Sequence, residues 1–204
     1  MLADPLEWLY AMTLAKSSLP QLSFHRDAEA ARVASSLGGM HASALRRFDW
    51  SRPVIYMPPF RRLAEGSVVV AVEGYTARRL VELGVRPHVV VSDLDFEPEH
   101  VSLGEIAVIH AHGDNIGRLP LYKPSPRIYT VQTWPPPGTY NVGGFTDGDR
   151  AAYLAASQGA ERIVVSGFYP ELPIKRDDEI KRRKLSIART LLARLSRSIT
   201  IDFI

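Results

Sequence analysis

Polar residues that could bind a metal ion or take part in catalysis stand directly after two runs of apolar, β-branched residues. Residues 89–91 (Val-Val-Val) lead into Ser92-Asp93-Leu94-Asp95, and residues 106–109 (Ile-Ala-Val-Ile) lead into His110-Ala111-His112-Gly113-Asp114-Asn115. Such runs are typical of buried strands, and open α/β sheets bind ligands just past their strand ends. Converging carboxylates repel one another unless a hard cation neutralises them, and Mg²⁺ prefers oxygen ligands. The pattern predicts a Mg²⁺-dependent site for a phosphorylated ligand.

Asp93 and Asp95 are the strongest candidates for this site. They are two residues apart, so on an extended backbone they project to the same side and can share one cation. The alternative is a solvated turn in which Asp95 caps a local loop. The preceding valine run favours the metal interpretation.

His110, His112 and Asp114 alternate in the same way. Two such histidines could bind a transition metal, but the oxygen-rich surroundings argue against zinc. A neutral histidine beside phosphate would hydrogen-bond an oxygen or orient a carboxylate, and packing of one histidine in the core is an equal alternative. Asp114 is either a metal ligand, direct or through water, or the N-cap of a helix.

A glycine-rich segment, Gly143-Gly144-Phe145-Thr146-Asp147-Gly148-Asp149-Arg150, precedes a predicted helix. Its glycines allow a backbone to approach a ligand closely. Thr146 and Asp149 have the spacing of a capping box, which gives Asp149 a structural role. Asp147 has no such role and is expected to face the site. Arg150 would either reach a phosphate or pair with Asp149.

The elements that must position these groups follow from the periodicity of the chain. The first fifty residues read as helical, with breaks near Leu19-Pro20 and Gly38-Gly39, and strands and helices alternate from Pro53 onward. Strands are predicted at 54–57, 67–72, 88–92, 105–110, 127–132, 162–166 and 198–204, and helices from Thr76 to Gly84, from Thr146, and at 178–197. Short connections predict an α/β fold with a doubly wound, mainly parallel sheet flanked by helices. We expect a single catalytic domain over 1–204, with an N-terminal helical segment (1–50) and an α/β core (53–204).

Composition bounds the class of protein. With 204 residues, 46% apolar and 23% charged, the chain is of ordinary globular type, and cysteine is absent. The absence of cysteine excludes disulfides, thiolate metal sites and cysteine nucleophiles. No apolar stretch approaches the roughly 20 residues that cross a bilayer, and the acidic start (Asp4, Glu7) is not that of a signal peptide. We expect a cytoplasmic protein.

The charge balance bears on partners. The net charge is only +3, and the one dense basic run, Lys181-Arg182-Arg183-Lys184, is expected to be the solvated face of a helix. We therefore expect no nucleic-acid or membrane partner. A homo-oligomer is left open.

At the motifs quoted above the sequence resembles the archaeal 6-hydroxymethyl-7,8-dihydropterin pyrophosphokinase family. The resemblance is carried by Ser92-Asp93-Leu94-Asp95, by His110-Ala111-His112-Gly113-Asp114-Asn115, and by Asn141-Val142-Gly143-Gly144-Phe145-Thr146-Asp147-Gly148-Asp149-Arg150-Ala151. A more distant similarity, to thiamine pyrophosphokinase catalytic domains, rests on Asp93-Leu94-Asp95 and Thr146-Asp147.

The resemblance implies transfer of the β,γ-diphosphoryl unit of ATP to the hydroxymethyl group of a reduced pterin, with release of AMP, in tetrahydrofolate- or methanopterin-type biosynthesis. Mg²⁺ would bridge the ATP phosphates and the protein. The expected metal ligands are Asp93, Asp95, Asp114 and Asp147, and the expected catalytic residues are Asp93, Asp95 and Asp147. The expected ATP-binding residues are His110, His112, Asn115, Gly143, Gly144, Thr146 and Arg150. Candidates for holding the pterin ring are Asn115, Gln132 and Trp134.

Two segments depart from the family pattern. Relatives usually carry Ala-Asp-Gly-Ala where this chain has Val72-Glu73-Gly74-Tyr75, and Met57-Pro58-Pro59-Phe60 replaces a glycine-containing loop. Two alternative functions therefore stay open. One is a thiamine pyrophosphokinase-like transferase with another alcohol acceptor. The other is a non-catalytic nucleotide- or metal-binding module, which the altered loop favours and the full carboxylate set disfavours.

Overall fold

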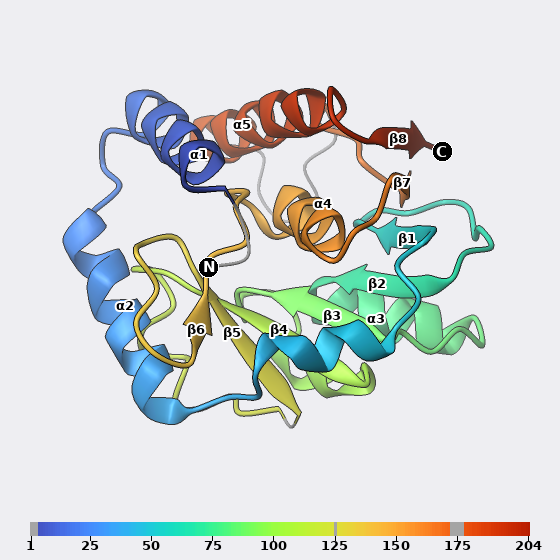
Figure 1. Ribbon diagram of the computed structural model, residues 1–204, viewed down its shortest axis with the longest axis horizontal. Coiled ribbons are helices and arrows are strands. Elements are labelled where there is room, and N and C mark those ends of the chain that lie inside the picture. Colours follow the sequence, from blue (N-terminus) through green and yellow to red (C-terminus); the bar gives the residue numbers. More distant parts are fainter. Residues whose placement is uncertain (1–3, 125, 172–177) are drawn as a thin grey trace.

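The computed structural model describes residues 4–124, 126–171 and 178–204, and its centre is one eight-stranded sheet (Figure 1). The strands lie in the order β6-β5-β4-β3-β2-β1-β7-β8, and every neighbouring pair is parallel. The strands are β1 (Pro53–Tyr56), β2 (Val68–Val72), β3 (Val89–Ser92), β4 (Ile106–Ala111), β5 (Arg127–Val131), β6 (Thr139–Tyr140), β7 (Arg162–Ser166) and β8 (Thr200–Phe203).

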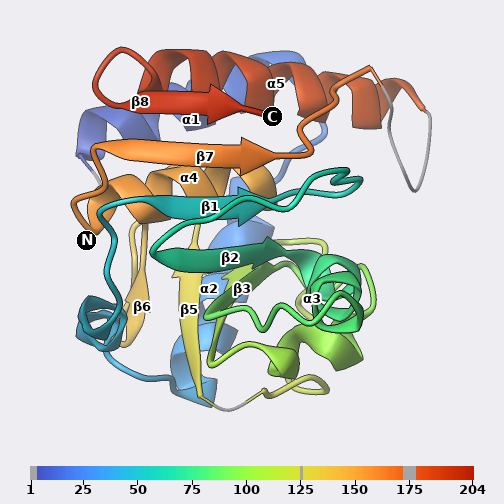
Figure 2. The same cartoon turned by 90° about the vertical axis from the view of Figure 1, so that its right-hand side faces the viewer.

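The order of the strands creates a switch point between β1 and β7. The chain adds β1 to β6 in one direction and then returns to place β7 on the other side of β1. Figure 2 shows β8, β7, β1 and β2 side by side with their arrowheads at one edge. Because all strands run the same way, the loops that follow them gather at that carboxyl edge.

Helices cover both faces of the sheet. They are α1 (Pro5–Ser18), α2 (Phe24–Leu37), α3 (Glu73–Glu82), α4 (Asp147–Ser157) and α5 (Glu179–Leu195), with 3-10 turns η1 (Ala42–Arg47) and η2 (Pro98–Leu103). One apolar core joins the sheet to α4 and the end of α5, and a second joins it to α2 and α3. A third, smaller cluster packs α1 on α5. The residues of β3 and β4 are all buried, as expected for parallel strands covered on both faces.

The predicted fold class is confirmed, and apart from α3 the predicted strands and helices lie within one or two residues of their predicted bounds. Three local predictions are wrong. Helix α3 begins at Glu73, so Thr76 is buried inside it and does not cap it. The segment from Gly113 to Leu121 forms turns, so Asp114 caps no α-helix. No strand is predicted between residues 132 and 162, but Thr139–Tyr140 form β6. None of the helices in the described part of the chain is long and apolar enough to cross a membrane.

Candidate active site

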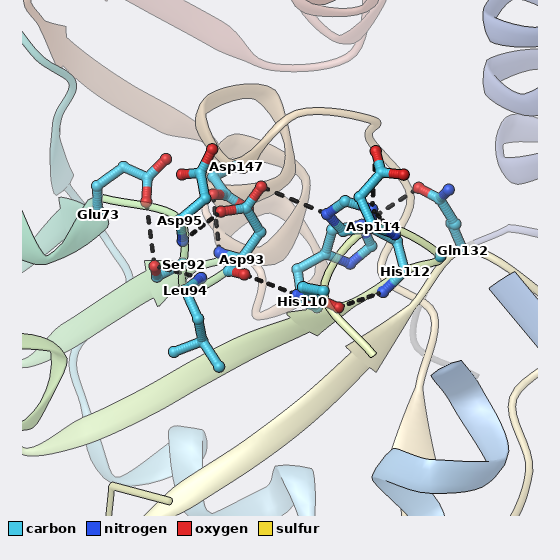
Figure 3. Close-up of polar contacts among 12 residues, drawn as sticks. Glu73, Ser92, Asp93, Leu94, Asp95, His110, His112, Asp114, Gln132 and Asp147 are labelled. Atoms are coloured by element: carbon cyan, nitrogen blue, oxygen red, sulfur yellow. Dashed lines mark hydrogen bonds and ion pairs between the residues drawn. The ribbon is translucent and has the colours of Figure 1, made fainter. Parts of the chain in front are cut away.

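Three acidic side chains meet at the carboxyl ends of β2 and β3. Glu73 follows β2, while Asp93 and Asp95 follow β3, and each offers a carboxylate oxygen within 4.8 Å of the others (Figure 3). The two strands are hydrogen-bonded neighbours, so their ends bring these residues to one place. Hard oxygen donors at this spacing can share one divalent cation, so the set fits Mg²⁺.

The turn after β3 explains why Asp93 and Asp95 converge. Leu94 has a φ of 66°, so the backbone is not extended there. Instead the N–H of Asp95 donates to Asp93 Oδ1 at 3.0 Å, and the N–H of Leu94 donates to Ser92 Oγ at 3.0 Å. The two carboxylates do meet as predicted, but the predicted reason, alternation along an extended strand, is wrong.

The loops after β2 and β3 have unusual backbone conformations and pack closely against each other. Glu73, Leu94 and Glu97 all have positive φ values (72°, 66° and 51°), and such non-glycine residues cluster at functional sites. A Cβ on Gly74 would lie 1.8 Å from the carbonyl oxygen of Glu97, so only glycine permits this contact. Ser92 Oγ also donates to the Glu73 carboxylate at 3.0 Å. Glu73 is thereby held against the two aspartates.

Asp147, the first residue of α4, brings a fourth carboxylate to the cluster. Its Oδ2 accepts the N–H of Asp93 at 2.9 Å, while its Oδ1 is buried and accepts no hydrogen bond from a described residue. Burial, and then the negative charges of Asp93 and Asp95, raise the pKa of Asp147 to about 7. A buried carboxylate beside two others is ionised readily only when a cation is near.

Asp149 has the structural role predicted for it. Its carboxylate accepts the N–H groups of Phe145 and Thr146, at 2.6 and 2.9 Å, and also the Thr146 hydroxyl. This is the predicted capping box at the start of α4. Burial raises the pKa of Asp149, against the effect of these hydrogen bonds.

The two glycines before α4 serve packing and not approach to a ligand. Both have positive φ and are buried. A Cβ on Gly143 would lie 2.8 Å from the Tyr153 ring, and one on Gly144 would lie 2.6 Å from the backbone of Arg150. These glycines were predicted to admit a ligand. In the structure they allow α4 to pack closely and so help to position Asp147.

Arg150 is fully buried and lies outside the lining of the pocket, so the structure does not place it at the surface where a phosphate would bind. Its Nη2 donates to the Gly144 carbonyl at 3.2 Å, and Nε and Nη1 make no hydrogen bond within the described residues. Burial lowers the pKa of Arg150 to about 10, against the stabilising charges of Asp149, Asp147 and Asp27. It acts as an internal counter-charge beneath the carboxylates.

A chain of side-chain contacts holds the two histidines in place. His112 Nε2 lies 3.3 Å from Asp93 Oδ2, and its ring stacks on His110 with centroids 5.1 Å apart. His110 Nε2 lies 3.2 Å from Gln132 Oε1, and Gln132 Nε2 donates to Asp27 Oδ2 at 2.8 Å. Burial lowers the pKa of His110 well below its usual value, so it is neutral. Asp93 is thus oriented by a chain of contacts that begins at Asp27 on α2, and Figure 3 shows Gln132, His110, His112 and Asp93 of this chain.

Three predicted binding residues differ from their expected roles. Asn115 uses its whole amide internally: its NH₂ group donates to the carbonyls of Asp93 and His110, and its Oδ1 accepts the N–H of His112. The Asp114 side chain is 70% exposed and stands apart from the carboxylate cluster, 3.9 Å from His112. Trp134 is exposed and does not line the pocket.

The pocket above the carboxylates contains residues that sequence reasoning missed. Lys181 and Lys184 come from the first turns of α5 and are three residues apart, so they share one face of that helix. Neither ammonium forms an ion pair with a described residue, although the basic run was expected to be simply solvated. The pocket is lined by Leu22, Glu73, Asp93, Asp95, His110, His112, Asp114, Gln132, Phe145, Thr146, Asp147, Asp178, Ile180, Lys181 and Lys184.

Asp27 is a further residue that the sequence alone does not single out, and its replacement tests this arrangement. Its Oδ1 accepts the N–H of Gly113 at 2.8 Å, so Asp27→Ala leaves that donor and the Gln132 amide buried without a partner. Each unsatisfied group costs about 1–3 kcal/mol, so we expect the melting temperature to fall by about 5–15 °C. Thermal unfolding followed by circular dichroism measures this. Glu29→Ala, at an exposed carboxylate on the same helix, is the control. Equal melting temperatures for the two variants would contradict the role of Asp27 in holding Gly113 and Gln132.

Fold and site together define an α/β protein with a pocket of carboxylates and lysines at the carboxyl edge of a parallel sheet. Three curated archaeal relatives carry the name 6-hydroxymethyl-7,8-dihydropterin pyrophosphokinase. The Pyrococcus furiosus protein is 44% identical over 60% of this chain and 59% of its own length. The Methanothermobacter thermautotrophicus protein is 37% identical over 70% and 69%. The Methanocaldococcus jannaschii protein is 32% identical over 78% and 69%.

The chain therefore belongs to the 6-hydroxymethyl-7,8-dihydropterin pyrophosphokinase family, and the family resemblance carried by its three motifs is confirmed. The matched region spans 59–69% of the length of these relatives. No family model matches the chain.

Proposed function

We propose that this protein transfers the β,γ-diphosphate of ATP to the hydroxymethyl group of 6-hydroxymethyl-7,8-dihydropterin and releases AMP. The observation that carries the proposal is one pocket in which Glu73, Asp93, Asp95 and Asp147 lie with two lysines, Lys181 and Lys184. The names of the relatives support the acceptor. Such an activity belongs to tetrahydrofolate- or methanopterin-type biosynthesis, in the cytoplasm.

The carboxylates would hold Mg²⁺. Glu73, Asp93 and Asp95 are the proposed ligands, and the unpartnered Asp147 Oδ1 stands beside them as a further ligand or as the group that orients the acceptor hydroxyl. When bound, the ion neutralises and polarises phosphate oxygens. His112, oriented by Asp93, would hydrogen-bond a phosphate oxygen.

The lysines complete the charge balance of the pocket. Four carboxylates alone would repel a triphosphate, whereas Lys181 and Lys184 offer it two cations in the same pocket. In the reaction a bond forms between the acceptor oxygen and the β-phosphorus. The bond from that phosphorus to the α,β-bridging oxygen breaks, the bridging oxygen leaves with AMP, and the hydroxyl proton is released. Such transfers depend on alignment and on charge neutralisation more than on covalent catalysis.

The products of the reaction test the proposal. Purified protein with ATP, Mg²⁺ and the reduced pterin should form AMP and diphosphorylated pterin in equal amounts, with little ADP. A panel of other primary alcohols, thiamine included, tests the acceptor. Formation of ADP, or hydrolysis of ATP at the full rate without acceptor, would contradict the proposal. Binding of ATP without any turnover would favour the non-catalytic module.

A further inference from the structure

A second hollow adjoins the carboxylates at the switch point between β1 and β7. Its walls come from the loop after β1 (Met57, Pro58), the loop after β7 (Phe168, Tyr169), Phe96 and Leu185 of α5. We call this the β1–β7 hollow. In doubly wound sheets the switch point is where the loops diverge and ligands bind.

We infer that the β1–β7 hollow receives the flat, uncharged ring of the acceptor, while the triphosphate of ATP occupies the pocket of the two lysines. This inference rests on the proposed function. It assigns the two substrates to opposite sides of the carboxylates.

The chemistry of the hollow suits a flat ring better than a phosphate. Three aromatic side chains and four other apolar ones (Met57, Pro58, Val72 and Leu185) line it, and aromatic faces stack on planar heterocycles. Two of the rings are braced: Phe96 stacks on Tyr75 at 4.8 Å and 5°, and the Arg61 guanidinium lies 5.0 Å from the Tyr169 ring. Phosphate loops bind through backbone N–H groups, and Pro58 and Pro59 have none.

The two cavities meet where the reaction must occur. Glu73, Thr146, Asp147 and Lys181 line both of them. A ring in the β1–β7 hollow could therefore present its hydroxymethyl group to a phosphate held on the other side, at the carboxylates. Lys184 lines only the first pocket, and Tyr169 and Leu185 line only the hollow.

The residues first considered for the pterin ring do not offer a competing place. Both ends of the Gln132 amide are engaged, by Asp27 and His110. The Asn115 amide is fully used, and Trp134 lies outside the pocket. The polar groups that remain accessible in the first pocket are mostly charged, which matches a triphosphate better than a neutral pterin.

The test is a comparison of KM values for the two substrates. Tyr169→Ala and Leu185→Ala should each raise the KM of the pterin about tenfold and change that of ATP less than twofold. Lys184→Gln should instead raise the KM of ATP about tenfold and change that of the pterin less than twofold. Tyr10→Ala, an exposed tyrosine on α1 far from this hollow in sequence, is the matched control and should change neither. Two separate hollow variants guard against a folding defect in one, which circular dichroism would reveal.

The outcomes separate the inference from the proposed function. If the wild-type protein forms no AMP with the pterin, the proposed function fails and the inference falls with it. If the wild-type protein is active and the hollow variants raise the KM of ATP instead, the hollow is the nucleotide site. If the wild-type protein is active and both KM values stay unchanged, the hollow holds neither substrate. Each of the last two results overturns the inference alone.

Discussion

Replacement of Asp147 by Asn should lower AMP production by about two orders of magnitude and, at the same time, raise the melting temperature of the metal-free protein. The loss of activity is on the scale of removing one electrostatic catalytic group. The gain in stability has a separate cause. Burial and the charges of Asp93 and Asp95 raise the pKa of Asp147 to about 7, so ionising it in the folded protein costs free energy.

The sign of the pH dependence follows from that shift. The folded-state pKa is above the ordinary aspartate value, so the ionisation of Asp147 lowers the stability of the wild-type protein as the pH rises from about 4 to about 7. Asn carries no charge and can still accept the Asp93 N–H. The variant should therefore melt like the wild type near pH 4 and several degrees higher at pH 8, in the presence of a chelator. Scanning calorimetry at both pH values measures this.

Asp149→Asn is the matched comparison because it changes the same atoms two residues along α4. The Asp149 carboxylate caps the helix through Phe145 and Thr146, and loss of a cap costs about 0.5–2 kcal/mol. This variant should melt lower and keep most of its activity per folded molecule. If Asp149→Asn abolishes turnover in a folded protein while Asp147→Asn retains it, the two roles are reversed.

Asp93→Asn should reduce turnover more, by about three orders of magnitude. This residue joins every part of the site: it lies in the carboxylate cluster, its N–H binds Asp147, and its Oδ2 faces His112. Its loss should weaken both metal binding and the orientation of His112. Initial rates of AMP formation at saturating ATP, over a range of Mg²⁺ concentrations, give the size of the loss and the shift in metal requirement.

Glu99→Gln provides the control for a lost negative charge near this region. Glu99 is an exposed carboxylate on η2 and lines neither cavity. It should leave the rate and the Mg²⁺ requirement unchanged. A loss of less than tenfold in Asp93→Asn, or an equal loss in both variants, would mean that Asp93 is not a ligand.

The sequence was informative where local pattern decides the outcome. Valine-rich runs identified β2 and β3, because a buried parallel strand needs nothing more than continuous apolar residues. The same runs located Asp93 at a strand end, and the spacing of Thr146 and Asp149 identified the start of α4. Each of these inferences depends on residues within a few positions of one another.

The rest of the site depends on contacts between distant segments. Asp27 reaches Gln132 across 105 residues, and nothing in its own neighbourhood distinguishes it from a solvated helix residue. Lys181 and Lys184 looked like part of a charged surface until α5 placed them over the carboxylates. Gly143 and Gly144 had a clear conformational signal, but only the positions of Tyr153 and Arg150 show that helix packing uses it.

The most direct test of the central claim follows the phosphorus atoms. ATP labelled with ³²P only at the β-position is incubated with the protein, Mg²⁺ and 6-hydroxymethyl-7,8-dihydropterin, and the products are separated. Transfer of the intact β,γ-diphosphate predicts that the label appears in the pterin product, in the same molar amount as unlabelled AMP. Label retained in ADP, or released as inorganic phosphate or diphosphate independently of the pterin, would contradict the account.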